Sequence, residues 1–362
     1  ILREFNLNLV FTGNNFSGNA SGLYLDGMVG PWSPGLSNTF NGVGAGVVVY
    51  LNSTSNVTIN AYDLSSVSDV GTAVFLNNTI NTSLTNLDAT GRLTAVETSG
   101  GDTGLTIDNV DGSGSGNSWT FLIRDHANDL VFTNNSMSGK QFGARFDGQL
   151  GPWTLHSTND FTGIGTGVAL ELTGGNDIIV DNMDMSAASD LGTGIYLNGT
   201  ADVIVTGNNL SGRNRGIESV GVNTGSTIDG NDVSGAGSDY GMVLRNHDSA
   251  LILTSNNFAG RGSGLWLQGQ GGPWTLPTSN ILTDITTGEA IRVDSSANIV
   301  IDGHVLSGTG DGIGVLVNGC PGIEVSNNDL RDRRHGIQFT GGGNSSAIVD
   351  NNDVSGSGSD FG

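Results

Sequence analysis

The sequence of 362 residues predicts an all-β solenoid, in which short repeated coils of chain stack on one another. Two nested repeats indicate this architecture, and the alternation of apolar with polar residues indicates strands within each repeat. The composition agrees, because glycine accounts for 59 residues and the hydrophobic fraction of 36% is too high for a disordered chain. We therefore expect a single continuous solenoid over 1–362 rather than separate globular domains.

The longer repeat is marked by the tripeptide Gly-Pro-Trp, which occurs three times at a spacing of 121 residues (151 − 30 and 272 − 151). The same shift superposes LVFTGNNFSG, near the start of the chain, on LVFTNNSMSG and LILTSNNFAG. The chain therefore consists of long repeats at approximately 1–121, 122–242 and 243–362, and its ends fall within the pattern, as expected for a piece of a longer protein.

A shorter repeat lies within each long one. Segments that begin with glycine recur every 22–27 residues between Gly167 and Gly288, and five of them fill one long repeat. In GIYLNGTADVIVTGNNLSGRNR, which begins at Gly194, two alternating apolar runs are separated by Gly, Asn, Asp and Ser. Such runs predict strands joined by tight turns. Each segment has too few apolar side chains for its own core, so the segments must stack.

Asparagines in the turns support this stacking. Asn tolerates the left-handed backbone of a tight turn, and stacked Asn side chains form amide ladders. Tyr62, Met183 and His304 replace the asparagine once in each long repeat, which helps to explain why the repeat contains five segments. The predicted structural ladder comprises Asn14, Asn135, Asn208, Asn231, Asn256 and Asn328.

These repeats resemble the PbH1 repeats of right-handed parallel β-helix proteins in the pectate-lyase-like superfamily, with their pattern GIxLxxSxNVxIxxNxI. The matching stretches are GIYLNGTADVIVTGNNLSG and GVLVNGCPGIEVSNNDLR, and the resemblance covers essentially the whole chain. It implies a right-handed parallel β-helix of about fifteen coils, five per long repeat. It implies little about activity, because this scaffold carries lyases, hydrolases, phage tailspikes, adhesins and copper-delivery accessory proteins of the NosD type.

The charge and composition exclude several classes of partner. A formal net charge of −22 disfavours nucleic acid, and no apolar run is long enough to span a membrane. Cys320 is the only cysteine, so no intrachain disulfide can form. No cofactor is predicted; calcium is the one weak alternative, because GTGDGIG at 308–314 is similar to a glycine-rich calcium-binding repeat but occurs once.

No catalytic constellation can be identified. The Asp-Asp pair and Gly-His-Gly that the resemblance implies for polygalacturonase-like hydrolases are missing. Asp181, Asp184 and Asp190 form the nearest acidic cluster, and His126 and His247 recur one long repeat apart. An active site is a unique arrangement, whereas most polar features here recur. We therefore expect a protein that is not an enzyme.

Six recurring side chains are candidates for lateral contacts with a partner, because tryptophan is enriched at interface centres. Burial of the indoles over the core and exposed charged turns are the alternatives. The candidates are Trp32, Trp153, Trp274, Arg92, Arg213 and Arg333.

The sequence is thus interpreted as an extracellular or cell-surface filament or stalk that associates end to end and also laterally. Two alternatives are kept. One is a polysaccharide-processing enzyme or tailspike, and the other is a carbohydrate-binding module without catalysis.

Overall fold

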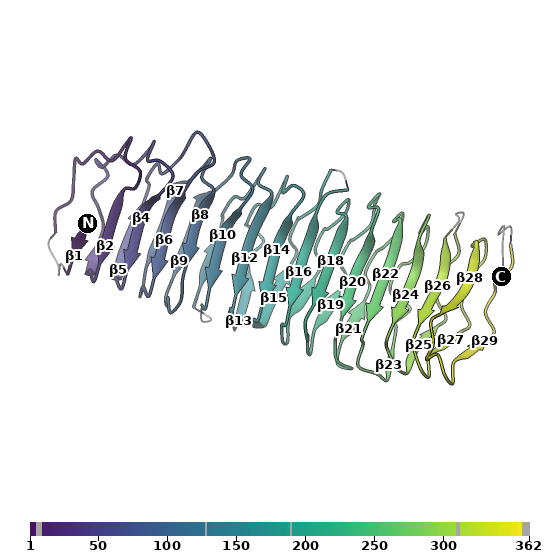
Figure 1. Ribbon diagram of the computed structural model, residues 1–362. Coiled ribbons are helices and arrows are strands. Elements are labelled where there is room, and N and C mark those ends of the chain that lie inside the picture. Colours follow the sequence, from purple (N-terminus) through teal and green to yellow (C-terminus); the bar gives the residue numbers. More distant parts are fainter. Residues whose placement is uncertain (5–8, 127–128, 189, 309–311, 357–362) are drawn as a thin grey trace. The chain divides into compact units, whose positions relative to one another are not determined.

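The chain folds into parallel β-strands joined by turns and loops (Figure 1). The computed structural model describes residues 1–4, 9–126, 129–188, 190–308 and 312–356, and these ranges contain no helix. Neighbouring strands run in the same direction, so successive coils of chain, here called rungs, repeat one backbone path. About 14 rungs are formed, which confirms the predicted all-β parallel solenoid.

Two compact units, Ile1–Ile179 and Val180–Gly362, make up the chain. In each unit, most rungs contribute one strand to a long sheet and one to a second sheet, and isolated parallel bridges such as Asp63 to Asp88 line a third side.

In unit 1 the long sheet contains eight strands within the described residues. They are β1 (Leu2–Arg3), β2 (Leu23–Asp26), β4 (Val47–Asn52), β6 (Thr72–Asn77), β8 (Thr94–Thr98), β10 (Trp119–Arg124), β12 (Phe142–Asp147) and β14 (Val168–Thr173). The second side of this unit contains β3 (Val29–Trp32), β5 (Ser55–Asn60), β7 (Ser83–Asp88), β9 (Thr106–Asp111), β11 (Val131–Thr133) and β13 (Leu150–Leu155).

In unit 2 the long sheet contains seven described strands. They are β16 (Thr193–Asn198), β18 (Arg215–Val220), β20 (Tyr240–Arg245), β22 (Ser263–Gln268), β24 (Glu289–Asp294), β26 (Ile313–Asn318) and β28 (His335–Thr340). The second side contains β17 (Ile204–Thr206), β19 (Thr227–Asp229), β21 (Ile252–Thr254), β23 (Trp274–Thr275), β25 (Ile299–Asp302), β27 (Glu324–Ser326) and β29 (Ile348–Asp350), while β15 (Asn176–Asp181) crosses the division.

Most strands of the long sheet share one burial pattern, which separates a core face from an outward face. In β10 the side chains of Phe121 and Ile123 are buried, whereas Leu122 between them is partly exposed. The register places inward apolar side chains of successive rungs next to one another, as Val74 pairs with Val96 on the next rung. The core is therefore a stack of inward apolar side chains, and burial of each such side chain stabilises the stack by about 1.5–3 kcal/mol.

The six asparagines of the predicted ladder lie in a column of turns within each unit. Each donates an Nδ2–H to the Oδ1 atom of an asparagine one rung further along, as from Asn208 to Asn231 (2.9 Å) and from Asn231 to Asn256 (3.0 Å). The equivalent bonds of Asn14, Asn135, Asn256 and Asn328 run to Asn38, Asn159, Asn280 and Asn352.

Two of the side chains that replace asparagine in this column keep a polar contact with the preceding rung. The hydroxyl of Tyr62 donates to the carbonyl of Gly35 (2.7 Å), and Nε2 of His304 lies 3.1 Å from the carbonyl oxygen of Leu276. The column therefore provides donors for backbone carbonyls even where the ladder is interrupted.

A second column contains buried cations that bind backbone carbonyls of earlier rungs. In unit 1, Nε of Arg92 donates to Leu64 (2.6 Å) on the preceding rung, and Nη1 donates to Val43 (2.8 Å), two rungs back. Lys140 donates in turn to the carbonyl of Arg92 and approaches Asp69 (3.3 Å).

Unit 2 repeats this arrangement. Arg213 donates to Met185 (2.6 Å), Arg261 to the carbonyl of Arg213 (2.6 Å), and Arg333 to the carbonyl of Leu306 (2.6 Å). Burial lowers the pKa of Arg213, Arg261 and Arg333 to about 10, so these side chains still carry their charge at neutral pH.

Replacing Arg92 by Met should destabilise unit 1 by about 3 kcal/mol or more, because several buried carbonyl groups would lose their donors. Chemical denaturation followed by circular dichroism would measure this loss. Arg92→Lys should reduce the free energy of unfolding by less, because Lys140 already donates to a backbone carbonyl from an equivalent buried position. The control is Arg331→Met, which alters an exposed ion pair and should leave the midpoint nearly unchanged. Equal midpoints for Arg92→Met and the control would contradict this role.

Candidate functional site

The three tryptophans of the Gly-Pro-Trp steps point into the protein. Trp32, Trp153 and Trp274 are 7%, 5% and 9% exposed, and each follows a cis Gly–Pro bond. Their indole N–H groups donate to the carbonyls of Leu9, Leu130 and Leu251 at 2.8–2.9 Å, one rung earlier in each case. The lateral-contact interpretation of these side chains is therefore corrected, because they cover the core and bind the backbone.

The same correction applies to the arginines predicted to make lateral contacts. Arg92, Arg213 and Arg333 are 0%, 0% and 4% exposed, and they are committed to backbone carbonyls. Lateral contact requires an accessible surface, which these guanidinium groups do not have.

The outward face of the long sheet in unit 1 carries an aromatic ladder on three successive strands. The register pairs Tyr24 of β2 with Tyr50 of β4, and Tyr50 with Phe75 of β6. The ring centroids are 4.7 and 4.9 Å apart, with interplanar angles of 66° and 85°. All three rings are partly exposed, and a cavity of about 290 Å³ opens beside Tyr24 and Tyr50.

A polar ladder lies beside the aromatic one, two residues further along the same strands. Nδ2 of Asn52 donates to Asp26 (2.7 Å), and Nδ2 of Asn77 donates to the Oδ1 atom of Asn52 (2.7 Å). Burial, and then the proximity of Tyr24 and Asp26, raises the pKa of Tyr50, so its phenol remains a hydrogen-bond donor at neutral pH. Exposed aromatic rings and fixed amide groups therefore share one face.

The outward face of unit 2 carries an aromatic ring between two cations. The guanidinium carbons of Arg245 and Arg292 lie 5.0 and 4.6 Å from the ring centroid of Trp266. The indole N–H donates to Asp294 (2.8 Å), and the ring of Tyr240 lies 5.4 Å away. Each contact joins neighbouring strands of the long sheet, since Trp266 pairs with Val243 and with Arg292.

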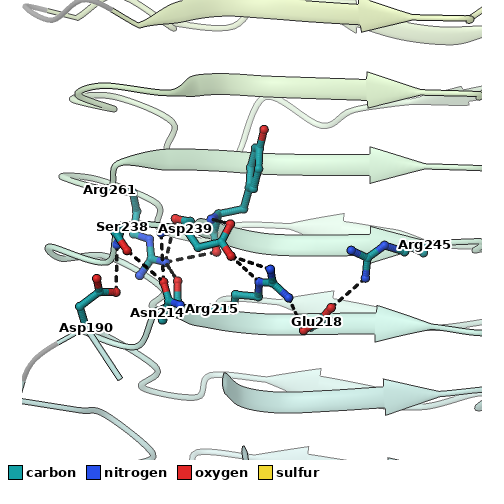
Figure 2. A network of polar contacts seen from close by, with 9 residues as sticks. Asp190, Asn214, Arg215, Glu218, Ser238, Asp239, Arg245 and Arg261 are labelled. Atoms are coloured by element: carbon teal, nitrogen blue, oxygen red, sulfur yellow. Dashed lines mark hydrogen bonds and ion pairs between the residues drawn. The ribbon is translucent and has the colours of Figure 1, made fainter. Parts of the chain in front are cut away.

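Ion pairs extend this group to Arg215 and Glu218 of β18, which Figure 2 shows together with Asp239 and Arg245. Glu218 accepts from Arg215 and from Arg245, both at 2.8 Å, and Arg215 also contacts Asp239 (2.6 Å). The Tyr240 hydroxyl donates to Glu289 (2.6 Å). Burial, and then this hydrogen bond, raises the pKa of Tyr240. The result is a fixed surface of alternating donors and acceptors.

The recurring histidines lie in the interior rather than at a surface site. His126 of unit 1 has its Nε2 atom 3.9 Å from the buried Asp102, and His247 of unit 2 lies 2.9 Å from the Ser219 hydroxyl. Burial lowers the pKa of both histidines to about 4. Because a substrate cannot reach them, neither pair is a candidate for catalysis.

The side chains that bind metals are likewise dispersed. No group of three or more His, Cys, Asp or Glu in the described ranges is arranged to hold a metal ion. Cys320 is buried and donates to the carbonyl of Val293 (3.3 Å), and all five methionines are buried. The stretch at 308–314 considered for calcium lies partly outside the described residues.

Sequence reasoning overlooked the outward positions of the long sheet. Tyr24, Arg145 and Trp266 occupy one position of the long repeat, and Tyr50, Glu171 and Arg292 occupy another. The inward neighbours of these residues are apolar in every copy, whereas the outward residues differ. The available signal was this difference among otherwise similar repeats.

Comparison with solved structures gives matches at low sequence identity and with TM-scores below 0.5. The A-module of mannuronan C-5 epimerase AlgE6 from Azotobacter vinelandii is 13% identical, with 98% of this chain and 89% of that chain covered and a TM-score of 0.37. Tailspike protein 3 of bacteriophage CBA120 is 11% identical, with 96% and 55% covered and a TM-score of 0.43. DFA-IIIase from Arthrobacter chlorophenolicus A6 is 12% identical, with 84% of each chain covered and a TM-score of 0.29.

A search of curated proteins gives no match. The model of a protein family described as "Periplasmic copper-binding protein (NosD)" matches residues 76–261 and 181–288, which together make up more than half of the chain. The repeats and the parallel β-helix of both units agree with this match, and the chain belongs to the NosD family.

Proposed function

We propose that the chain binds a polysaccharide along the outward face of the long sheet of unit 1 and does not cleave it. The observation that carries the proposal is the pairing of the ladder Tyr24–Tyr50–Phe75 with the polar ladder Asp26–Asn52–Asn77. Sugars are amphipathic, with apolar C–H faces that suit aromatic rings and hydroxyl groups that suit amides and carboxylates.

The spacing of the two ladders supports a polymer rather than a monosaccharide. The three strands β2, β4 and β6 each add one ring and one polar side chain, at intervals of about 4.8 Å. A chain of sugars crossing the strands would meet several equivalent weak contacts, and linked weak contacts add through multivalency. The outward face of unit 2 offers further donors and acceptors around Trp266.

The competing proposal is a polysaccharide-processing enzyme that uses the same face. Cleavage of a glycosidic bond ordinarily needs two opposed carboxyl groups, one of which carries a proton. The outward carboxylates Glu97 and Glu171 are instead engaged by Arg124 (3.0 Å) and Arg145 (3.3 Å). This engagement supports binding over cleavage.

Copper binding, which the family description names, receives no support from the donor side chains of this chain. Copper sites use converging His, Cys or Met ligands. Here Cys320 and all five methionines are in the core, and His126, His247 and His304 are buried. His156 and His335 are accessible, but neither belongs to a group of three or more His, Cys, Asp or Glu arranged to hold a metal ion within the described ranges. These residues do not fit a copper site, so no copper chemistry is assigned to them.

The hypothesis of a filament held together by lateral contacts is not supported, because the six side chains predicted to make these contacts are buried. End-to-end association stays a prediction.

For location, we propose the periplasm or the cell exterior, where polysaccharides are found. The family description supports this proposal. Within the ranges that the structure describes, a helix capable of crossing a membrane does not occur.

Tyr50→Ala should weaken polysaccharide binding about tenfold, equivalent to about 1.4 kcal/mol, because the central ring of the aromatic ladder is lost. Retardation in native gels containing a panel of soluble polysaccharides would measure the effect. Leu122→Ala is the matched control, because Leu122 occupies the same outward strand position three rungs further along. The proposal fails if no polysaccharide retards the wild-type chain, or if both variants bind as tightly as the wild type.

Incubation with each bound polysaccharide should release no reducing ends and no unsaturated products, with or without calcium. A colorimetric assay and the absorbance of unsaturated products would detect either. Reproducible release above a heat-inactivated sample, abolished by Tyr50→Ala, would favour the enzyme.

A further inference from the structure

The electrostatic character of the proposed ligand can be inferred from the cations of the chain. All 13 lysine and arginine side chains belong to residues that the structure describes, so their surroundings can be followed one by one. Five of them lie in the interior and donate to backbone carbonyls, where no ligand reaches them. They are Arg92, Lys140, Arg213, Arg261 and Arg333.

Seven further arginines lie at the surface, and each is within 4 Å of at least one carboxylate. The closest oxygen is 2.6 Å from the guanidinium group at Arg215 and 3.5 Å at Arg3. The seven are Arg3, Arg124, Arg145, Arg215, Arg245, Arg292 and Arg331. The remaining cation, Arg334, also has an interaction partner. An incoming anion therefore finds no arginine or lysine that is not already engaged.

The surface patch with the most arginines also contains enough carboxylates to compensate their charge. Around Trp266, three arginines (Arg215, Arg245 and Arg292) face four carboxylates, which belong to Glu218, Asp239, Glu289 and Asp294. Figure 2 shows the part of this patch formed by Arg215, Glu218, Asp239 and Arg245. The formal charge of the patch is thus −1. The guanidinium groups on both sides of Trp266 are fixed by stacking as well as by these ion pairs.

The net charge of the chain also disfavours the binding of anions. The chain carries 35 acidic side chains and a formal net charge of −22, so a polyanion is repelled before it reaches the outward face. A hydroxyl group behaves differently, because it can donate to an ion-paired carboxylate and accept from an ion-paired guanidinium group. Balanced ion pairs therefore suit an uncharged polyhydroxyl ligand.

We propose that the polysaccharide bound by this chain is uncharged, and that acidic polysaccharides are excluded. The inference rests on the proposed function, because it specifies the chemical class of ligand for the same outward face. It also assigns the surface ion pairs a role in selectivity, since they leave no net positive charge for a uronate or a sulfate.

The test compares polymers that differ in charge and little else. Each neutral polysaccharide of a panel of glucans, mannans, xylans and galactans is paired with its own carboxymethylated derivative, and methyl-esterified pectin is paired with de-esterified pectin. Binding of the full chain is measured by gel retardation in EDTA, at low and at high salt. At least one neutral polymer should bind at least about tenfold more tightly than its charged partner, with little salt dependence.

The possible outcomes separate the two proposals. Charged polymers that bind as tightly as their neutral partners, or more tightly, overturn the inference while leaving polysaccharide binding in place. Binding of charged polymers that appears only when calcium replaces EDTA also overturns it, because a bridging cation would then supply the positive charge. Absence of binding throughout the panel removes the proposed function itself, and the inference with it.

Tyr50→Ala and Leu122→Ala complete the design. Binding of the neutral polymer should fall for the first variant and persist for the second, which places the selective contact on the outward face of unit 1. Equal loss of binding in both variants would indicate general unfolding, which circular dichroism detects, and correctly folded variants that both bind like the wild type would overturn the assignment.

Discussion

The constraint on which this structure depends is the parallel main-chain ladder between rungs. A backbone N–H on one rung must meet a carbonyl on the next, so every rung has to repeat the path of its neighbour. The register pairs carry this requirement through both units, as Val74 with Val96 in unit 1 and Ile217 with Met242 in unit 2. Equivalent side chains are thereby brought into columns. The side chains of one column therefore share one physical role: they bury apolar surface, donate hydrogen bonds to backbone carbonyls, or face the solvent.

The sequence predicted the parts that follow directly from periodicity. Alternating runs such as GIYLNG and VIVTG predict strands, and turn asparagines at regular intervals predict stacking. Asn208, Asn231 and Asn256 accordingly form consecutive amide hydrogen bonds. These predictions succeed because local pattern and long-range pairing have the same period.

The predictions about individual polar side chains failed for a physical reason. Arginine is ordinarily found in exposed turns, yet a turn that packs against earlier rungs leaves buried carbonyls that need strong donors. Arg92 and Arg213 meet that need, and nothing in the local pattern of the sequence indicates it. The repetition of polar features predicts that the chain has no unique site. The outward positions differ from this pattern, because Tyr24, Arg145 and Trp266 are chemically different residues at one position of the long repeat.

The buried cations have a consequence for how such a chain can lengthen by gene duplication. Arg92 binds a carbonyl two rungs earlier, and Lys140, Arg261 and Arg333 do the same at their own positions. Inserting one coil between donor and acceptor would leave the buried cation and its carbonyl partners without their hydrogen bonds. Copying a block that contains the whole set would preserve every such contact. Selection against single-coil insertions would then maintain an inherited unit of 121 residues, long after the outward side chains of its copies had diverged.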